Sequence, residues 1–188
     1  MVGITGASGS IYGVRLLEAL RAVPDVEIHL VVSRAGKRTL QEETDYPLKA
    51  VEALAHVVYD DRDIGASPAS GSFKTMGMAI APCSIKTVAA LAQCFADTLI
   101  ARAGDVTLKE GRPLVAVVRE TPLHAGHLRQ MLTLAEIGGV ILPPVPAFYN
   151  RPKTLDDIVS HTVGRVLDRL GIEQSLVPEW TGGGRRPE

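Results

Sequence analysis

Short apolar runs alternate with longer helical patterns along most of this chain. The apolar runs, rich in aliphatic residues, occupy residues 1–5, 26–32, 57–59, 76–81, 114–118 and 140–142. The helical patterns occupy residues 11–22, 35–43, 48–55, 84–102, 124–137 and 155–170. Continuous apolar runs of this length are typical of strands that helices cover on both faces. The alternation therefore predicts an α/β fold of three layers, with a parallel sheet flanked by helices.

The composition narrows the range of partners. The chain has 188 residues, 46% of them hydrophobic, and a formal net charge of -1. A chain without a basic surplus is not expected to bind nucleic acid or an anionic membrane. No apolar run approaches the roughly 20 residues of a membrane span, and the two cysteines form no C-x-x-C pattern. We expect a cytoplasmic protein with one domain over residues 1–173 and a tail, 174–188, that is mobile or at a subunit contact.

The first predicted strand ends in a glycine-rich turn, Gly6-Ala7-Ser8-Gly9. The turn lacks the G-x-G-x-x-G spacing, and the second strand leads into Ser33 rather than into an acidic residue. Both facts argue against a dinucleotide site. The turn can still present backbone N–H groups and the Ser8 hydroxyl to an anion at a helix start. The alternative is a turn that serves only the close packing of strand and helix.

Hydroxyl groups follow two further predicted strands. Ser84 and Thr87 lie in the segment PCSIKT, where a strand becomes a helix, and Ser33 ends the second strand. They can act as plain helix caps, or their hydroxyls can surround a phosphate monoester. Arg119 and Glu120 directly follow another strand, where charges serve a ligand or pair with each other.

The segment PPVPAFYNRP, residues 143–152, is a stiff loop that follows the last predicted strand. Its prolines restrict the backbone around Phe148 and Tyr149. A rigid aromatic loop of this kind can form the wall of a flat ligand site, a subunit contact, or both.

Three features suggest chemistry that we do not expect here. Asp60, Asp61 and Asp63 lack the spacing of a metal-dependent prenyl-diphosphate site, which favours a solvated loop. A histidine pair, His124 and His127, has no third ligand at a suitable spacing, so we assign no metal. Cys83 is a possible nucleophile, but a buried strand end is the simpler interpretation.

Several motifs together resemble the UbiX/Pad1 family of flavin prenyltransferases. The similarity is colinear over about residues 1–170, and it rests on GASGSIYG (6–13), SGSFKTMGM (70–78), PCSIKT (82–87), DVTLKEGRPLV (105–115), RETPLH (119–124), PPVPAFYNRP (143–152) and DDIV (156–159). This resemblance implies a flavodoxin-like, Rossmann-like fold and a homododecamer. It also implies transfer of a dimethylallyl group from dimethylallyl monophosphate to N5 and C6 of reduced FMN, without a metal. The product, prenylated FMN, would then pass to a UbiD-type decarboxylase.

The resemblance also implies a set of site residues. The residues that match the FMN contacts of the family are Gly6, Ala7, Ser8, Ser33, Ser84, Ile85, Lys86, Thr87 and Arg119. Those that match contacts to the donor phosphate are Lys109, Tyr149 and Arg165, and we expect Lys109 in a turn, where it serves the site of a neighbouring subunit. Glu120, Ser8 and Glu43 are the candidate catalytic residues, with Glu120 managing a proton and Ser8 relaying it. Two alternatives are an FMN-binding protein similar to cysteine decarboxylases and a non-catalytic flavin carrier.

Overall fold

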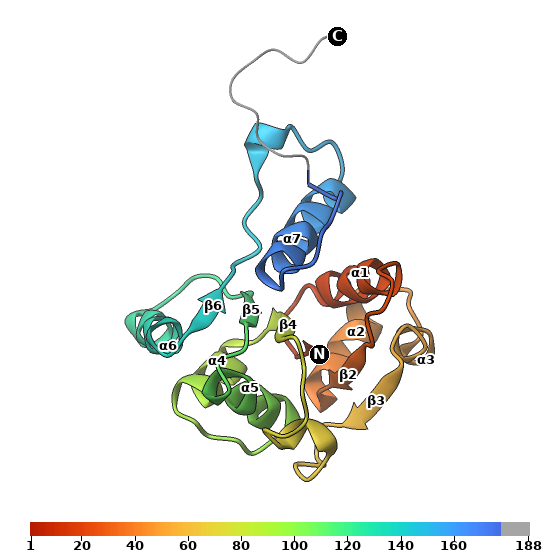
Figure 1. Ribbon diagram of the computed structural model, residues 1–188. Helices are drawn as coiled ribbons and strands as arrows, with labels where there is room; N and C mark the ends of the chain where they lie inside the picture. The colour runs from red at the N-terminus through yellow and green to blue at the C-terminus, as the bar shows by residue number, and fades with distance from the viewer. Residues whose placement is uncertain (178–188) are drawn as a thin grey trace.

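The computed structural model describes residues 1–177 and shows a six-stranded parallel sheet in the order β3-β2-β1-β4-β5-β6 (Figure 1). The strands are β1 (Val2–Ile4), β2 (His29–Val32), β3 (Val57–Asp60), β4 (Met78–Cys83), β5 (Leu114–Val118) and β6 (Gly139–Ile141). The register pairs Gly3 with Val31 on one side and with Ile80 on the other, so β1 lies at the centre. The predicted α/β class and the predicted positions of all six strands are confirmed.

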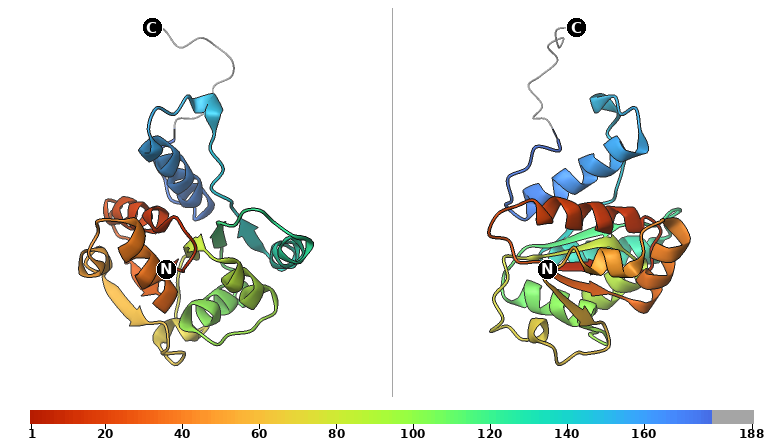
Figure 2. Two further views of the ribbon diagram at one scale, coloured as in Figure 1. Left: turned by 180° about the vertical axis from the view of Figure 1, so that it is seen from behind. Right: turned by 90° about the vertical axis from the view of Figure 1, so that its right-hand side faces the viewer.

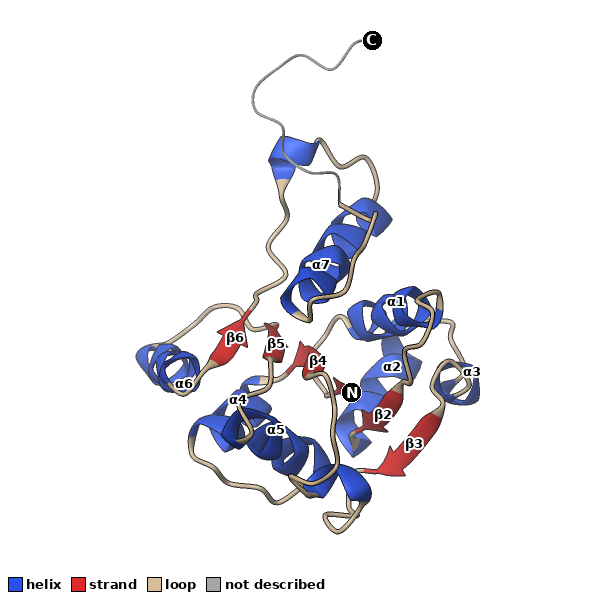
Figure 3. Ribbon diagram, viewed as in Figure 1, coloured by secondary structure: helices blue, strands red, loops and turns tan. Residues whose placement is uncertain are grey.

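Helices cover both faces of the sheet, as Figures 2 and 3 show. The α-helices are α1 (Ser10–Arg21), α2 (Arg34–Glu43), α3 (Leu48–Glu52), α4 (Ile85–Ala92), α5 (Leu99–Lys109), α6 (Ala125–Glu136) and α7 (Leu155–Arg169). Two short 3₁₀ helices, η1 (Ser67–Ala69) and η2 (Phe148–Asn150), lie in the connections. The hydrophobic core on one face packs against α1, α2, α3 and α7, and the core on the other packs against α4, α5 and α6.

Side chains of the central strands alternate between these two cores. Val115 and Val117 of β5 belong to the core beside α1 and α7, whereas Ala116 and Val118 belong to the opposite core. This period of two follows from the pleat of a strand, and burial of both faces explains why the sequence shows uninterrupted apolar runs. The edge strand β3 is an exception, because its Val58 is 43% exposed.

Two glycines let α1 lie close to the strand ends. A side chain at Gly13 would collide with the Ala81 carbonyl of β4, so the helix can approach the sheet only without one. Gly9, which precedes α1, has φ of 103°, a left-handed conformation that favours glycine. Within the GASG turn itself, a side chain at Gly6 would collide with Ala35 of α2, so the turn does have the packing role that the sequence left open.

The predicted helix 84–102 is wrong as a single element. It is divided by a loop between α4 and α5, in which Cys94 has φ of 53°. Thr98 begins the second helix, because its hydroxyl accepts a hydrogen bond from Ala101 N. Asp61 reinforces this start by accepting a hydrogen bond from Ile100 N at 3.0 Å. The second helix continues to Lys109, so the expectation that Lys109 lies in a turn is also wrong.

The segment after β6 forms an arm that leaves the sheet and returns as α7 (Figures 1 and 2). A capping box at Thr154 and Asp157 begins α7, as the sequence predicted for Thr154. The helix packs against α1. Of the expected tail 174–188, Gln174 binds Asp168 of α7 at 3.1 Å, and residues from 178 onward lie outside the described part. No helix within residues 1–177 is long and apolar enough to cross a membrane.

Candidate functional site

The carboxyl ends of the strands meet at one edge of the sheet, around the gap between β1 and β4. The chain builds β1, β2 and β3 outward and then returns to place β4 beside β1, so the direction of strand addition reverses there. Open α/β sheets bind ligands outside the strand ends at such a reversal. The turn 6–9, Ser33, Ser84 and Arg119 each directly follow strands that end at this edge. The structure thus gathers there most of the residues predicted to contact FMN.

The turn after β1 already binds a carboxylate of the protein itself. Gly9 offers no side-chain cap to α1, and Glu43 at the end of α2 replaces it. The Glu43 Oε2 atom accepts hydrogen bonds from Gly9 N at 2.8 Å and Ser10 N at 3.1 Å, and the Ser8 hydroxyl also bonds to this carboxylate. Burial alone raises the pKa of Glu43, but these hydrogen bonds and the Arg119 charge lower it overall below its usual value. Glu43 is therefore held as an anion beside Ser8.

The hydroxyls after β2 and β4 are helix caps. Ser33 Oγ accepts a hydrogen bond from Gly36 N at 3.0 Å, and Ser84 Oγ accepts one from Thr87 N at 3.4 Å. The Thr87 hydroxyl lies 3.1 Å from Ser84 Oγ, so two hydroxyls meet at the start of α4. The first N–H groups of a helix lack acceptors within it and favour anions. Two such starts, α2 and α4, face the same edge of the sheet, an arrangement suited to a phosphate.

Arg119 and Glu120 do not form the ion pair that the sequence left open. Within the part of the chain that the structure describes, neither side chain takes part in a salt bridge. Arg119 N donates to the Cys83 carbonyl at 3.2 Å, which ties the end of β5 to the end of β4. Burial raises the pKa of Tyr12 above its usual value, and the Arg119 guanidinium charge opposes that shift. The same charge helps to lower the pKa of Glu43. Glu120 accepts a hydrogen bond from Thr121 N at 3.2 Å.

Tyr149 and Arg165 lie on the arm, and His161 lies between them. The Tyr149 hydroxyl is 3.5 Å from His161 Nε2, and the two rings meet edge to face at 6.2 Å. Arg165 follows His161 by one helical turn and lines the same cavity of about 190 Å³. Burial and the Arg165 charge lower the pKa of His161, against the opposing effect of Asp168. The sequence analysis missed His161, although its i, i+4 spacing to Arg165 could have indicated a shared helix face.

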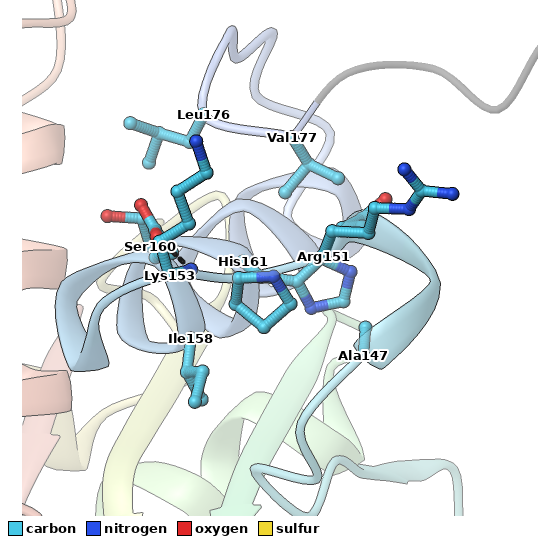
Figure 4. A pocket seen from close by; sticks show the side chains of 11 residues that line it. Ala147, Arg151, Lys153, Ile158, Ser160, His161, Leu176 and Val177 are labelled. Atoms are coloured by element: carbon cyan, nitrogen blue, oxygen red, sulfur yellow. Dashed lines mark hydrogen bonds between the residues drawn. The ribbon is translucent and has the colours of Figure 1, made fainter. Parts of the chain in front are cut away.

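A second cavity, of about 280 Å³, opens on the arm beside His161 (Figure 4). Arg151 and Lys153 line it from the loop after η2, and Leu176 and Val177 line it from the end of the described chain. This cavity lies on the arm rather than around the strand ends. It is therefore separate from the group of residues that match flavin contacts.

Two lysines are placed differently from the rest of the predicted set. Lys109 ends α5 at the side of the sheet where β5 begins, and its Nζ lies 2.6 Å from Glu110 Oε1. Lys86 belongs to the first turn of α4, but its side chain is 63% exposed and pairs with Asp97 at 3.3 Å. Within one chain, neither ammonium group faces the gap between β1 and β4. Lys86 can serve a ligand there only through its backbone N–H.

The features that we set aside have structural explanations. Cys83 is completely buried, and burial raises the pKa of its thiol far above the usual range. The His124 and His127 rings lie against each other with centroids 3.5 Å apart and planes tilted by 34°. Asp61 is not simply part of a solvated loop, because it caps α5. Within residues 1–177, no group of three His, Cys, Asp or Glu side chains is arranged to hold a metal ion.

The sheet order and the hydroxyl-bearing helix starts at the β1/β4 gap can accommodate a phosphate group, as α/β flavoproteins do, and the comparison with known families assigns the chain to the flavoproteins. The family model described as Flavoprotein matches residues 1–167. The flavin prenyltransferase UbiX of Escherichia coli (strain K12) is 59% identical over 184 residues, which cover 97% of this chain and 97% of that protein. The chain therefore belongs to the UbiX family of flavin prenyltransferases.

Two solved structures share the whole fold. A dodecameric FMN-dependent UbiX-like decarboxylase from Escherichia coli O157:H7 superposes with a TM-score of 0.94 at 51% identity, covering 96% of this chain and 98% of that one. AnUbiX (PadA1), in complex with FMN and dimethylallyl pyrophosphate, also gives a TM-score of 0.94 at 45% identity, covering 97% of each chain. Both agree with the flavodoxin-like fold that the sequence resemblance implied.

Proposed function

We propose that this chain transfers a dimethylallyl group from dimethylallyl monophosphate to N5 and C6 of reduced FMN. Family membership over nearly the whole chain supports the reaction class. At the site, the proposal rests on the Glu43 carboxylate, which is ionised and lies beside Ser8 in the turn 6–9. The carboxylate that caps α1 is thereby placed beside the hydroxyl that is assigned to relay protons.

The flavin phosphate is assigned to the starts of α2 and α4. The N–H groups at the start of α1 already bind Glu43, so a second anion there would be repelled. Ser33, Ser84 and Thr87 supply hydroxyls at the other two helix starts, and Arg119 supplies a positive charge at the same edge. This donor set fits a phosphate monoester. The flavin ring then extends toward the turn 6–9, which places Gly6, Ala7 and Ser8 beside its reacting edge.

The donor phosphate is assigned to Tyr149 and Arg165, together with Lys109 of a neighbouring subunit. Tyr149 contacts His161 on the arm, and Arg165, whose guanidinium pairs with Asp168 at 2.7 Å, lines the same cavity as His161. Lys109 lies at the opposite edge of its own sheet, so another copy must supply it. The dodecameric relative supports an assembly in which this is possible, and we infer a homo-oligomer of the same kind for this chain. Charged and hydroxyl groups around the phosphate stabilise it as it leaves.

Reduced FMN supplies the nucleophilic N5 and C6 positions that take up the five-carbon unit. Closing the second bond adds one proton to the alkene of the five-carbon unit and releases one from flavin C6. Glu120 is assigned to accept the proton released at C6, and Ser8 relays protons between the site and Glu43. The Ser8 hydroxyl can do this because it already bonds to the Glu43 carboxylate. The reaction needs no metal in this scheme, because Lys109, Tyr149 and Arg165 neutralise the leaving phosphate. Prenylated FMN then passes to a UbiD-type decarboxylase.

One experiment separates this function from its alternatives. The purified protein is mixed anaerobically with reduced FMN and dimethylallyl monophosphate, and the released flavin is analysed by mass spectrometry. A flavin that has gained one five-carbon unit supports the transferase. Unchanged flavin, despite tight binding, supports a carrier or a flavoprotein similar to cysteine decarboxylases. A parallel reaction with dimethylallyl pyrophosphate, the compound bound to AnUbiX, shows which donor is preferred.

A further inference from the structure

Thr5 is the first residue after β1, and its side chain crosses the gap to β4. It is 2% exposed and is one of few buried polar residues in the described chain. Its hydroxyl donates to the Pro82 carbonyl at 2.8 Å and accepts a hydrogen bond from Ser84 N, also at 2.8 Å. Its backbone N–H donates to the same Pro82 carbonyl at 3.2 Å. Three hydrogen bonds thus join Thr5 to the segment that leads into α4.

The Thr5 side chain makes these hydrogen bonds at the point where the regular backbone pairing between β1 and β4 ends. The regular register between β1 and β4 pairs Val2 with Ala79 and Gly3 with Ile80. Beyond that point no further β1–β4 pair follows in the register, β4 is irregular in its pairing with β5 between Ile80 and Cys83, and Pro82 has no N–H to donate. Ser84 N, which lies just past the end of β4, bonds to the side-chain oxygen of Thr5 instead of a carbonyl of β1.

The start of α2 is fastened to β1 by a different kind of bond. Ser33 N donates to the Ile4 carbonyl at 2.9 Å, so backbone atoms alone fix that helix start. At the start of α4 the equivalent bond, from Ser84 N, goes to the Thr5 hydroxyl, while the neighbouring backbone bonds hold the preceding residues Pro82 and Cys83. A substitution can remove the second connection without touching the first. The starts of α2 and α4, to which the flavin phosphate is assigned, are therefore held against β1 by different kinds of bond. A backbone carbonyl holds the first, and a side-chain hydroxyl holds the second.

We propose that Thr5 is a positioning residue of the flavin site, which holds the Ser84 helix start at a fixed distance from the turn 6–9 and from Ser33. Thr5 is itself buried and does not touch the ligand. Its hydroxyl fixes Ser84, and Ser84 with Thr87 then presents its hydroxyls and N–H groups to the phosphate. The inference rests on the proposed assignment of the flavin phosphate to the starts of α2 and α4.

The test compares Thr5→Val, which keeps the shape but removes the hydroxyl, with Thr5→Ser, which keeps the hydroxyl. Thr107→Val is the matched control, because Thr107 is 4% exposed and its hydroxyl donates to the Ala103 carbonyl at 2.7 Å, far from the strand ends. FMN affinity is measured by calorimetry, with KM and kcat from prenylation assays and Tm from thermal melts. Each variant is measured as the assembled full-length protein.

We expect Thr5→Val to weaken FMN binding about tenfold, the effect of one or two lost buried hydrogen bonds. KM for FMN rises accordingly, kcat at saturation changes little, and Thr5→Ser restores affinity. The proposal is overturned if Thr5→Val binds FMN like the wild type, if Thr5→Ser is as weak as Thr5→Val, or if Thr107→Val loses as much affinity.

A Ser84→Ala variant separates this inference from the proposed function. If Ser84→Ala weakens FMN binding while Thr5→Val does not, the phosphate assignment is supported and the positioning role of Thr5 is rejected. If Ser84→Ala binds FMN as tightly as the wild type, the phosphate assignment fails, and the inference fails with it. If Thr5→Val does not fold, the Thr5→Ser variant and a Thr5→Ala variant give the same comparison of hydroxyl against no hydroxyl.

Discussion

Lys109 and Arg119 lie at opposite ends of β5. Lys109 ends α5 just before the strand begins, and Arg119 follows the last residue of the strand. Two residues separated in this way by the length of one strand cannot touch a single small ligand in the same protomer. If both serve one reaction, each site must combine Arg119 of one copy with Lys109 of another.

This arrangement predicts complementation between inactive subunits. Lys109→Ala and Arg119→Ala are each expected to abolish most activity as pure proteins. When the two are dissociated, mixed in equal amounts and reassembled, about a quarter of the sites should contain both intact residues if the subunits mix at random. Prenylation by the mixture, measured against each pure variant treated identically, checks this. A mixture as inactive as its components would show that both residues act within one chain.

Glu43 should give the fold a characteristic dependence on pH. The folded-state pKa of Glu43 lies below its usual value of 4.5, so its hydrogen bonds stabilise the fold above that pH and are lost as the pH falls through the lowered pKa. Glu43→Gln should lower Tm at neutral pH by about 2–4 °C, the effect of a lost helix cap, and should reduce the loss of stability on acidification. Thermal melts over a range of pH measure this.

Glu42→Gln is the matched control for that prediction, because Glu42 pairs with Arg38 on the exposed surface of the same helix. Equal shifts in both variants would mean that the bonds of Glu43 to α1 contribute nothing specific.

Glu120→Gln should separate the two bond-forming steps. The amide keeps the shape of the side chain and its capacity to accept a hydrogen bond from Thr121 N, but it is not a base at neutral pH. We expect FMN binding to remain and the closing of the fourth ring to be blocked. The open and closed products have the same mass, so chromatography and absorption spectra must distinguish them. Normal amounts of closed product would remove Glu120 from its assigned role.

Tyr149→Phe should weaken the binding of the prenyl donor and leave the binding of FMN unchanged. The substitution removes a hydroxyl from the donor-phosphate group on the arm and leaves the ring in place. Loss of a hydrogen bond to a charged group should raise KM for dimethylallyl monophosphate about tenfold or more, with unchanged FMN affinity. Tyr46→Phe is the control, because the Tyr46 hydroxyl bonds to Glu18, at 3.2 Å, away from the arm. A change confined to FMN affinity would contradict the assignment.

Chelation should leave the activity unchanged. The proposed reaction neutralises the leaving phosphate with Lys109, Tyr149 and Arg165 instead of a divalent cation. Activity is therefore compared before and after dialysis against EDTA, and again after magnesium or manganese is added back. Loss on dialysis with recovery on addition of metal would contradict the metal-independent scheme.

The sequence could predict those parts of the molecule that depend on neighbouring residues. Apolar runs located the strands, and hydroxyls at strand ends located the starts of α2 and α4, because strand burial and helix capping are local. The break between α4 and α5 was missed although Thr98 is a local cap, and only its reinforcement by Asp61, 39 residues away from Ile100, has no local signal. The bond from Glu43 to Gly9 spans 34 residues and the bond from Thr5 to Ser84 spans 79, so neither has a sequence pattern of its own.

The buried thiol of Cys83 has a consequence for the lifetime of the enzyme. An enzyme that activates an allylic phosphate risks alkylating its own side chains, and a thiolate would be the fastest competitor for that carbon. Cys83 lies beside Ser84, next to the assigned flavin phosphate, but its sulfur has no exposure and remains protonated. Because its sulfur is buried and protonated, Cys83 does not compete with the flavin as a nucleophile.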